Sequence, residues 1–73
     1  MLTASYKDIL REDGSLGDLI LKIEAEYGWL WLVEELDLKF ARKHGKAVLC
    51  KSVSTGATRY IFPHHLEFSD PEA

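Results

Sequence analysis

The stretch LGDLILKIEAEYGWLWLV, residues 16–33, decides the fold, because it fits two periodicities. At helical spacing its apolar side chains gather on one face, namely Leu16, Leu19, Ile20, Ile23 and Tyr27. At strand spacing alternate positions are also apolar, namely Leu19, Leu21, Ile23, Ala25 and Tyr27. Local chemistry favours the helix, since Ser15 and Asp18 suit its start and Gly28 suits its end. We therefore expect a helix over residues 15–27.

The two tryptophans after Gly28 extend this ambiguity into the next segment. A helix over residues 29–44 would have one apolar face, formed by Trp29, Leu32, Val33, Leu36 and Phe40. Its acidic residues precede its basic ones, which suits the helix dipole, and a glycine follows. On this helix Trp29 joins the core and Trp31 points away from it. If residues 29–33 form a strand instead, both tryptophans share one face with Val33, and this alternative stays open.

Residues 47–62 predict a β-hairpin. Two β-rich runs, about 47–53 and 57–62, surround the turn sequence STGA. If Val53 pairs with Thr58, Lys51 and Arg59 lie near the tip on opposite faces. The second strand is expected to end before Pro63, since proline lacks the N–H that a ladder needs.

The N-terminal stretch TASYKDILREDG predicts a short helix over about residues 4–12. Ser5 and Asp8 form a capping-box-like start, and Asp13 with Gly14 ends the helix. The whole chain, residues 1–73, is then expected to be one α+β domain in which three helices pack against the C-terminal hairpin. Residues 69–73 are expected to be a flexible acidic tail.

Two family resemblances follow from these patterns. The expected order helix, helix, helix, hairpin resembles that of winged helix-turn-helix domains. The resemblance covers about residues 15–62, where the Gly28 to Gly45 segment and the following hairpin look like a recognition helix and wing, which implies DNA binding through the third helix. The end of the chain, STGATRYIFPHHLEF, is similar to the last strands of SH3-like barrels, where a strand ends at a proline and a short turn leads to a final strand. That resemblance implies, as the alternative fold, an SH3-like barrel with an N-terminal helix. It also implies peptide binding through Trp29, Trp31 and Tyr60.

Composition and charge limit the class of protein. The 73 residues carry a net charge of −3, but residues 1–35 contain three Lys or Arg against eight Asp or Glu. Residues 36–66 reverse this, with six Lys or Arg against one Asp, so a polyanion could contact only the middle segment. No apolar run is long enough to cross a membrane, and residues 1–10 lack the basic and then apolar pattern of a signal peptide. The single Cys50 suits a reducing compartment. We expect a cytoplasmic protein.

Motifs for catalysis or metal binding are absent from the sequence. It has no phosphate-binding glycine loop and no nucleophile motif, and its carboxylates form no acid–base pair. The soft or borderline metal ligands are Cys50, His44, His64 and His65, whose spacing matches no common zinc pattern. We expect no enzymatic activity, no cofactor and no metal.

The remaining hypothesis is binding of another macromolecule. Trp31 and Leu38, on the side of the helix away from the core, would form an apolar patch ringed by charge. The predicted protein interface consists of Trp31, Leu38, Glu34, Glu35 and Arg42. Its partner is another protein or a second copy in a homodimer, which suits an inhibitor, regulator or adaptor, including those encoded by phages and mobile elements. The alternative is a winged-helix-like transcriptional regulator, with candidate nucleic-acid contacts at Lys43, Lys46, Lys51 and Arg59.

Overall fold

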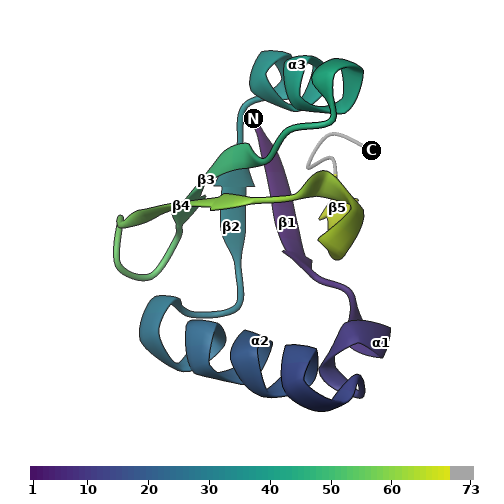
Figure 1. The fold of residues 1–73 in the computed structure, drawn as a ribbon. Helices are drawn as coiled ribbons and strands as arrows, with labels where there is room; N and C mark the ends of the chain where they lie inside the picture. Colours follow the sequence, from purple (N-terminus) through teal and green to yellow (C-terminus); the bar gives the residue numbers. More distant parts are fainter. Residues whose placement is uncertain (70–73) are drawn as a thin grey trace.

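The computed structural model describes residues 1–69 as an antiparallel sheet with helices at both ends of its strands (Figure 1). In chain order the elements are β1 (Leu2–Tyr6), α1 (Asp8–Arg11), α2 (Gly14–Tyr27), β2 (Trp31–Val33), α3 (Glu35–His44), β3 (Val48–Ser52), β4 (Thr58–Ile61), the 3-10 helix η1 (Pro63–His65) and β5 (Leu66–Ser69). The five strands lie in the order β4-β3-β2-β1-β5, and every neighbouring pair is antiparallel. The expected α+β class is confirmed.

The alternative fold is wrong in two respects. Within residues 1–69 the sheet stays open, with β4 and β5 as its edges, and the chain starts with a strand rather than a helix. The local pattern that suggested a barrel is nevertheless present, since η1 begins at Pro63 and leads into β5, which pairs with β1. Of the expected tail, Ser69 is the last residue of β5, and residues 70–73 lie outside the described part of the chain.

One face of the sheet forms the core. Alternate strand residues are buried there, namely Ala4, Tyr6, Trp31, Val33, Val48, Cys50, Ile61 and Leu66. Helix α2 adds Ile20 and Ile23, and α3 adds Leu38 and Ala41, to the same cluster. Figure 1 shows α2 below and α3 above the middle strands. The two helices therefore cover the sheet from opposite ends.

The predicted helix over residues 4–12 is wrong in its first half. Residues 2–6 form β1, which pairs with β2 on one side and with β5 on the other, and only Asp8–Arg11 is helical. Ala4 and Tyr6 alternate into the core, whereas the expected cap by Ser5 is not made and α1 has no side-chain cap. Pairing on both edges outweighs a weak local helix signal, because the strand gains a buried face as well as two ladders.

Helix α2 confirms the prediction for residues 15–27, with one more residue at its start. Gly17 lets α2 approach α1, since a Cβ there would lie 2.3 Å from the Arg11 carbonyl oxygen. Gly28 ends the helix at φ +88°, a conformation that other residues rarely adopt. The helix reading was therefore correct for the first part of the deciding stretch.

The second part of that stretch is not helical. Residues 31–33 form β2 between β1 and β3, and helix α3 starts only at Glu35. Trp31 is 0% exposed, whereas Trp29 lies before the strand and is 62% exposed. The predicted roles of the two tryptophans are thus reversed, because a central strand buries every second side chain whatever the helical wheel suggests.

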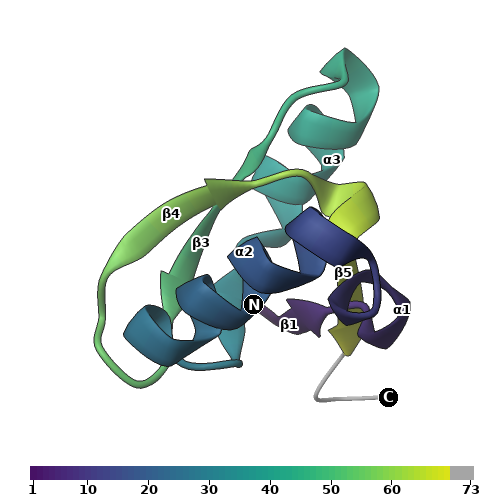
Figure 2. The same cartoon turned by 60° about the horizontal axis from the view of Figure 1, so that its bottom comes forward.

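The hairpin is confirmed, but its register is shifted. Lys51 rather than Val53 pairs with Thr58, and Leu49 pairs with Tyr60. The shift is an even number of residues, so each side chain keeps the face that the sequence assigned to it. The loop is longer than the predicted one because Ser52 holds it together. The Ser52 N–H donates to the Ala57 carbonyl, and the Ser52 carbonyl accepts from the Gly56 N–H. The Ser52 hydroxyl accepts from the Thr55 N–H at 3.2 Å. Figure 2 shows this loop beside the C-terminal end of α2.

Candidate binding surface around helix α3

Charged side chains at both ends of α3, and a glycine after it, mark where this helix begins and ends. Its first turn carries Glu35 and Asp37, whereas its last turn carries only basic side chains, an order that suits the helix dipole. Gly45 follows in the left-handed conformation, at φ +64°, and lets the Lys46 N–H donate to the Ala41 carbonyl at 2.9 Å. These local rules leave the C-terminal end of α3 strongly basic.

The outer side of α3 exposes large apolar side chains. Leu36 is 79% exposed and Phe40, one turn further on, is 56% exposed. Lys39 and Lys43 are exposed on the same side of the helix, opposite the buried Leu38. We call the surface formed by Leu36, Lys39, Phe40 and Lys43 the α3 ridge.

A hollow on one side of α3 extends the apolar surface. This hairpin groove has a volume of about 340 Å³ and is lined by Asp37, Phe40, Lys46, Ala47, Val48, Leu49 and Tyr60. Leu49 and Tyr60 are cross-strand partners on the face of the hairpin away from the core, and both are exposed. Phe40 therefore connects the ridge to two further apolar side chains.

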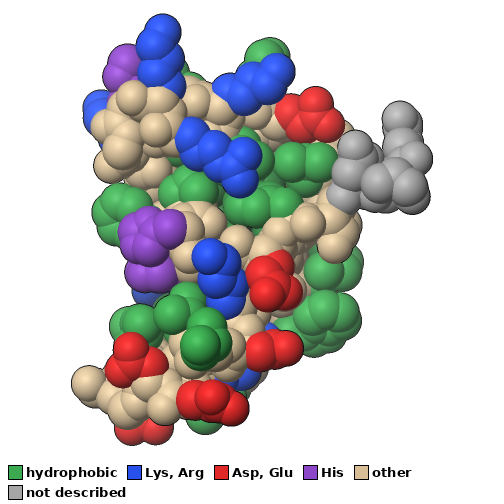
Figure 3. Space-filling view, turned by 90° about the vertical axis from the view of Figure 1, so that its right-hand side faces the viewer, with side chains coloured by type: hydrophobic (Ala, Val, Ile, Leu, Met, Phe, Trp, Pro, Cys, Tyr) green, Lys and Arg blue, Asp and Glu red, His purple; other side chains and the backbone are tan. Residues whose placement is uncertain are grey.

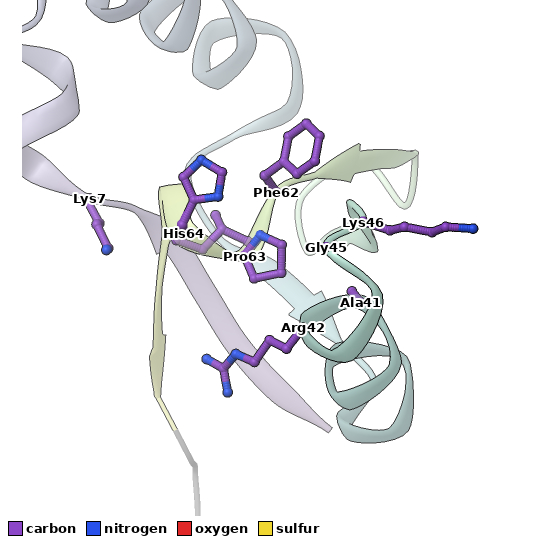
Figure 4. A pocket seen from close by; sticks show the side chains of 9 residues that line it. Lys7, Ala41, Arg42, Gly45, Lys46, Phe62, Pro63 and His64 are labelled. Atoms are coloured by element: carbon purple, nitrogen blue, oxygen red, sulfur yellow. The ribbon is translucent and has the colours of Figure 1, made fainter.

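A second cavity lies on the other side of α3. This basic pocket has a volume of about 420 Å³ and is lined by Lys7, Ala41, Arg42, Gly45, Lys46, Phe62, Pro63, His64 and Leu66 (Figure 4). Its four basic side chains come from different parts of the chain, and no acidic side chain lines it. Figure 3 shows the charge of the same side of the molecule, with Lys and Arg mainly in the upper part and Asp and Glu mainly in the lower part.

Few of these cations are neutralised. Within residues 1–69 the ion pairs are those of Arg11 with Asp8 and Glu24, at the opposite end of the sheet from α3. The pKa of the neighbouring His65 is lowered, first by its burial and then by the positive charges of His64 and Lys7. The basic pocket is therefore a region of positive potential.

The predicted protein interface does not form as expected. Trp31 and Leu38 are buried in the core, whereas Glu34, Glu35 and Arg42 are exposed. Because β2 precedes α3, the helix starts later and turns Leu36 and Phe40 outward. The helical periodicity of residues 29–44 predicts the opposite, with both side chains on the core face. Leu36 and Phe40 are four residues apart, so the sequence indicates that they share one face of a helix. It does not indicate that this face is exposed, because that depends on where the helix starts.

The four predicted nucleic-acid contacts are not on one surface. Lys43 and Lys46 lie at the end of α3, whereas Lys51 and Arg59 point to opposite faces of the hairpin. The Arg59 guanidinium lies 5.8 Å from the centre of the Tyr27 ring, on the core side of the sheet. The element order also differs from that of a winged helix, because strands precede α1 and α3.

Cys50 and the histidines form no metal centre in the described chain. Within residues 1–69 no three His, Cys, Asp or Glu side chains lie close enough to hold an ion. The Cys50 thiol is buried and donates to the Val48 carbonyl at 3.4 Å, and burial raises its pKa to about 12. The thiol is thus protonated and shielded at neutral pH.

Comparison with known proteins gives no relative from which a function could be transferred. No family model matches the chain, and no curated protein or solved structure is significantly similar to it. None of the helices in residues 1–69 is long and apolar enough to cross a membrane. Any function must therefore be argued from the surfaces around α3.

Proposed function

We propose that this protein is a non-enzymatic module that binds another protein through the α3 ridge and the hairpin groove. The observation that carries the proposal is the pair Leu36 and Phe40, which expose large apolar side chains next to each other on a well-formed helix. Contiguous apolar surface rimmed by charge typically marks an interaction site. Tyr is among the side chains that dominate binding energy at such sites, and Phe is enriched in them, so Tyr60 and Phe40 suit this role.

Charge indicates the chemistry of the partner. Lys39 and Lys43 flank the apolar side chains of the ridge, and Lys46 lines the groove. A matching segment would present apolar anchors with Asp or Glu around them, as an acidic amphipathic helix does. A second copy fits less well, because a two-fold interface would place the lysines of one ridge against those of the other.

The test begins with affinity capture from host extract, identification of the captured proteins, and titration of each purified candidate by calorimetry. Leu36→Glu and Phe40→Glu should each weaken binding at least about tenfold, because a charge replaces an apolar anchor. Ile9→Glu is the matched control, since the exposure of Ile9 lies between those of Leu36 and Phe40 but Ile9 is on α1. A candidate that binds wild type and the Leu36 variant equally would contradict the proposal.

Nucleic acid is the second candidate partner, and a specific observation favours it. Lys39, Arg42, Lys43 and Lys46 gather at one end of the molecule, close to the end of α3. Binding through these cations should weaken steeply with salt and should not depend on Leu36. A protein partner held through apolar anchors should tolerate salt and depend on Leu36, so one pair of titrations separates the two functions.

A further inference from the structure

We propose that the basic pocket is a binding site for an organic phosphate, with the phosphate held by the cations that line it. This site lies on the other side of α3 from the hairpin groove, so the inference goes beyond the proposed protein interface. The ligand is a phosphate monoester with a small carbon-based group attached.

The fold brings the cations together from distant positions in the sequence. Lys7 follows β1, Arg42 lies in the last turn of α3, and His64 lies in η1. In Figure 4 the Lys7 side chain lies apart from that of Arg42, with the ribbon of η1 and β5 drawn between them, and the Lys46 side chain extends away from both. Lys7, Arg42 and His64 thus line one cavity, although they are far apart in the sequence.

The charge of this space matches a phosphate monoester. A guanidinium and an ammonium supply several N–H donors and two positive charges, which suits a dianion with three terminal oxygens. No carboxylate lines the pocket, and within residues 1–69 neither Lys7 nor Arg42 forms an ion pair. The pKa of His65 is lowered mainly by burial and, to a smaller extent, by the charges of His64 and Lys7, which are close to it.

The remaining walls favour an organic ligand over the free ion. Ala41, Phe62, Pro63 and Leu66 line the pocket with apolar atoms, and Phe62 exposes an aromatic ring. A volume of about 420 Å³ lies within the range of about 300–1,000 Å³ that is usual for small-molecule sites. A base, sugar or peptide chain attached to the phosphate could therefore contact the wall while the phosphate meets the cations.

Two sources of this chemistry can be distinguished by titration. The probes are AMP, with adenosine as its control, and a short phosphoserine peptide, with the unphosphorylated peptide as its control. Binding is followed by chemical-shift changes in the amide spectrum of the full chain. We expect saturable changes at residues 7, 41–46 and 62–66 with one phosphorylated probe and none with its control.

Variants decide whether the pocket is responsible. Arg42→Gln and Lys7→Gln should each weaken binding about tenfold, since each removes a charged hydrogen-bond donor. Lys22→Gln, at an exposed position of α2, should leave the affinity unchanged. AMP binding assigns a free nucleotide and peptide binding assigns a phosphorylated protein. The proposal is overturned if neither probe binds wild type, or if the Arg42 variant binds as tightly as the Lys22 variant.

Discussion

The Trp31 indole packs against the Tyr27 ring, with ring centres 5.5 Å apart and planes inclined by 39°. This contact joins the end of α2 to the central strand, where Trp31 is completely buried in the core. Trp31→Ala should lower the free energy of unfolding by about 3–5 kcal/mol, the usual cost of emptying a large core site. Trp29→Ala should change it by less than about 0.5 kcal/mol, since that side chain is mostly exposed. Urea denaturation of both variants measures the difference.

Tryptophan fluorescence provides an independent check of the same contrast. The Trp29→Phe variant, which keeps Trp31, should emit at shorter wavelength than Trp31→Phe, which keeps the exposed Trp29. Trp31→Phe should also cost less stability than Trp31→Ala, because it keeps a ring and removes an indole N–H that has no partner among residues 1–69. Equal emission maxima for the two phenylalanine variants would contradict the burial of Trp31.

Arg11 joins α1 to α2 through a two-pronged contact with Glu24. Its Nε donates to Oε1 at 3.0 Å and its second terminal nitrogen to Oε2 at 2.6 Å, and both side chains are partly buried. Glu24→Gln should destabilise the protein by about 1–2 kcal/mol, because charge-assisted bidentate bonds are stronger than neutral ones. Asp8→Asn, at the exposed partner of the same arginine, should cost less than about 0.5 kcal/mol. Thermal unfolding measures both losses. If the Asp8 variant loses more stability than the Glu24 variant, α1 is held mainly by Asp8.

The sequence predicted those elements whose local signals agree with their final environment. Helix α2 has both a core-facing stripe and a glycine at its end, and the hairpin has β-rich runs around a turn. Even the faces of the hairpin were correct. Its register was not, because the Ser52 hydroxyl bonds the Tyr27 carbonyl, far away in the sequence, as well as Thr55.

The errors arise where partners distant in sequence override local preference. Residues 2–6 and 31–33 are strands because β1 lies between β2 and β5, and β2 between β1 and β3. Because β2 precedes α3, Leu36 and Phe40 face solvent. The candidate surface therefore could not be predicted before the topology was known. The basic pocket has the same origin, since Lys7, Arg42 and His64 meet only after the sheet has formed.

Cys50 should be unreactive in the folded protein. Burial raises the pKa of its thiol from an ordinary value of 9.0 to about 12, so the folded protein remains protonated where an unfolded chain would ionise. The stability that depends on this thiol is full below pH 9.0 and declines as the pH rises toward 12. Reaction with Ellman's reagent at pH 8 should therefore be slow in buffer and fast in denaturing urea. Rapid labelling in buffer would show that β3 opens easily.

The pH dependence on the acid side should include His65. Its pKa lies below the ordinary value of 6.5, through burial and the positive charges of His64 and Lys7. Below pH 6.5 an unfolded chain takes up a proton at this position more readily than the folded protein, so stability falls as the pH decreases. His65→Gln should reduce this slope in urea unfolding measured between pH 7 and 5. His64→Gln tests the contribution of the neighbouring charge. Because the charge of His64 lowers the pKa of His65, this substitution should raise that pKa, as measured by NMR.

Ser52 links the hairpin loop to the end of α2, and its removal should loosen that junction. The side chain is 1% exposed, donates to the Tyr27 carbonyl and accepts from the Thr55 N–H at 3.2 Å. Ser52→Ala keeps the burial but leaves these two main-chain groups without their partner, which should cost about 1–3 kcal/mol. Ser54→Ala is the control, because Ser54 is an exposed loop serine without a side-chain hydrogen bond in residues 1–69. In amide exchange the Thr55 N–H should lose its protection only in the Ser52 variant. If both variants unfold at the same urea concentration, the loop is held by its main-chain bonds alone.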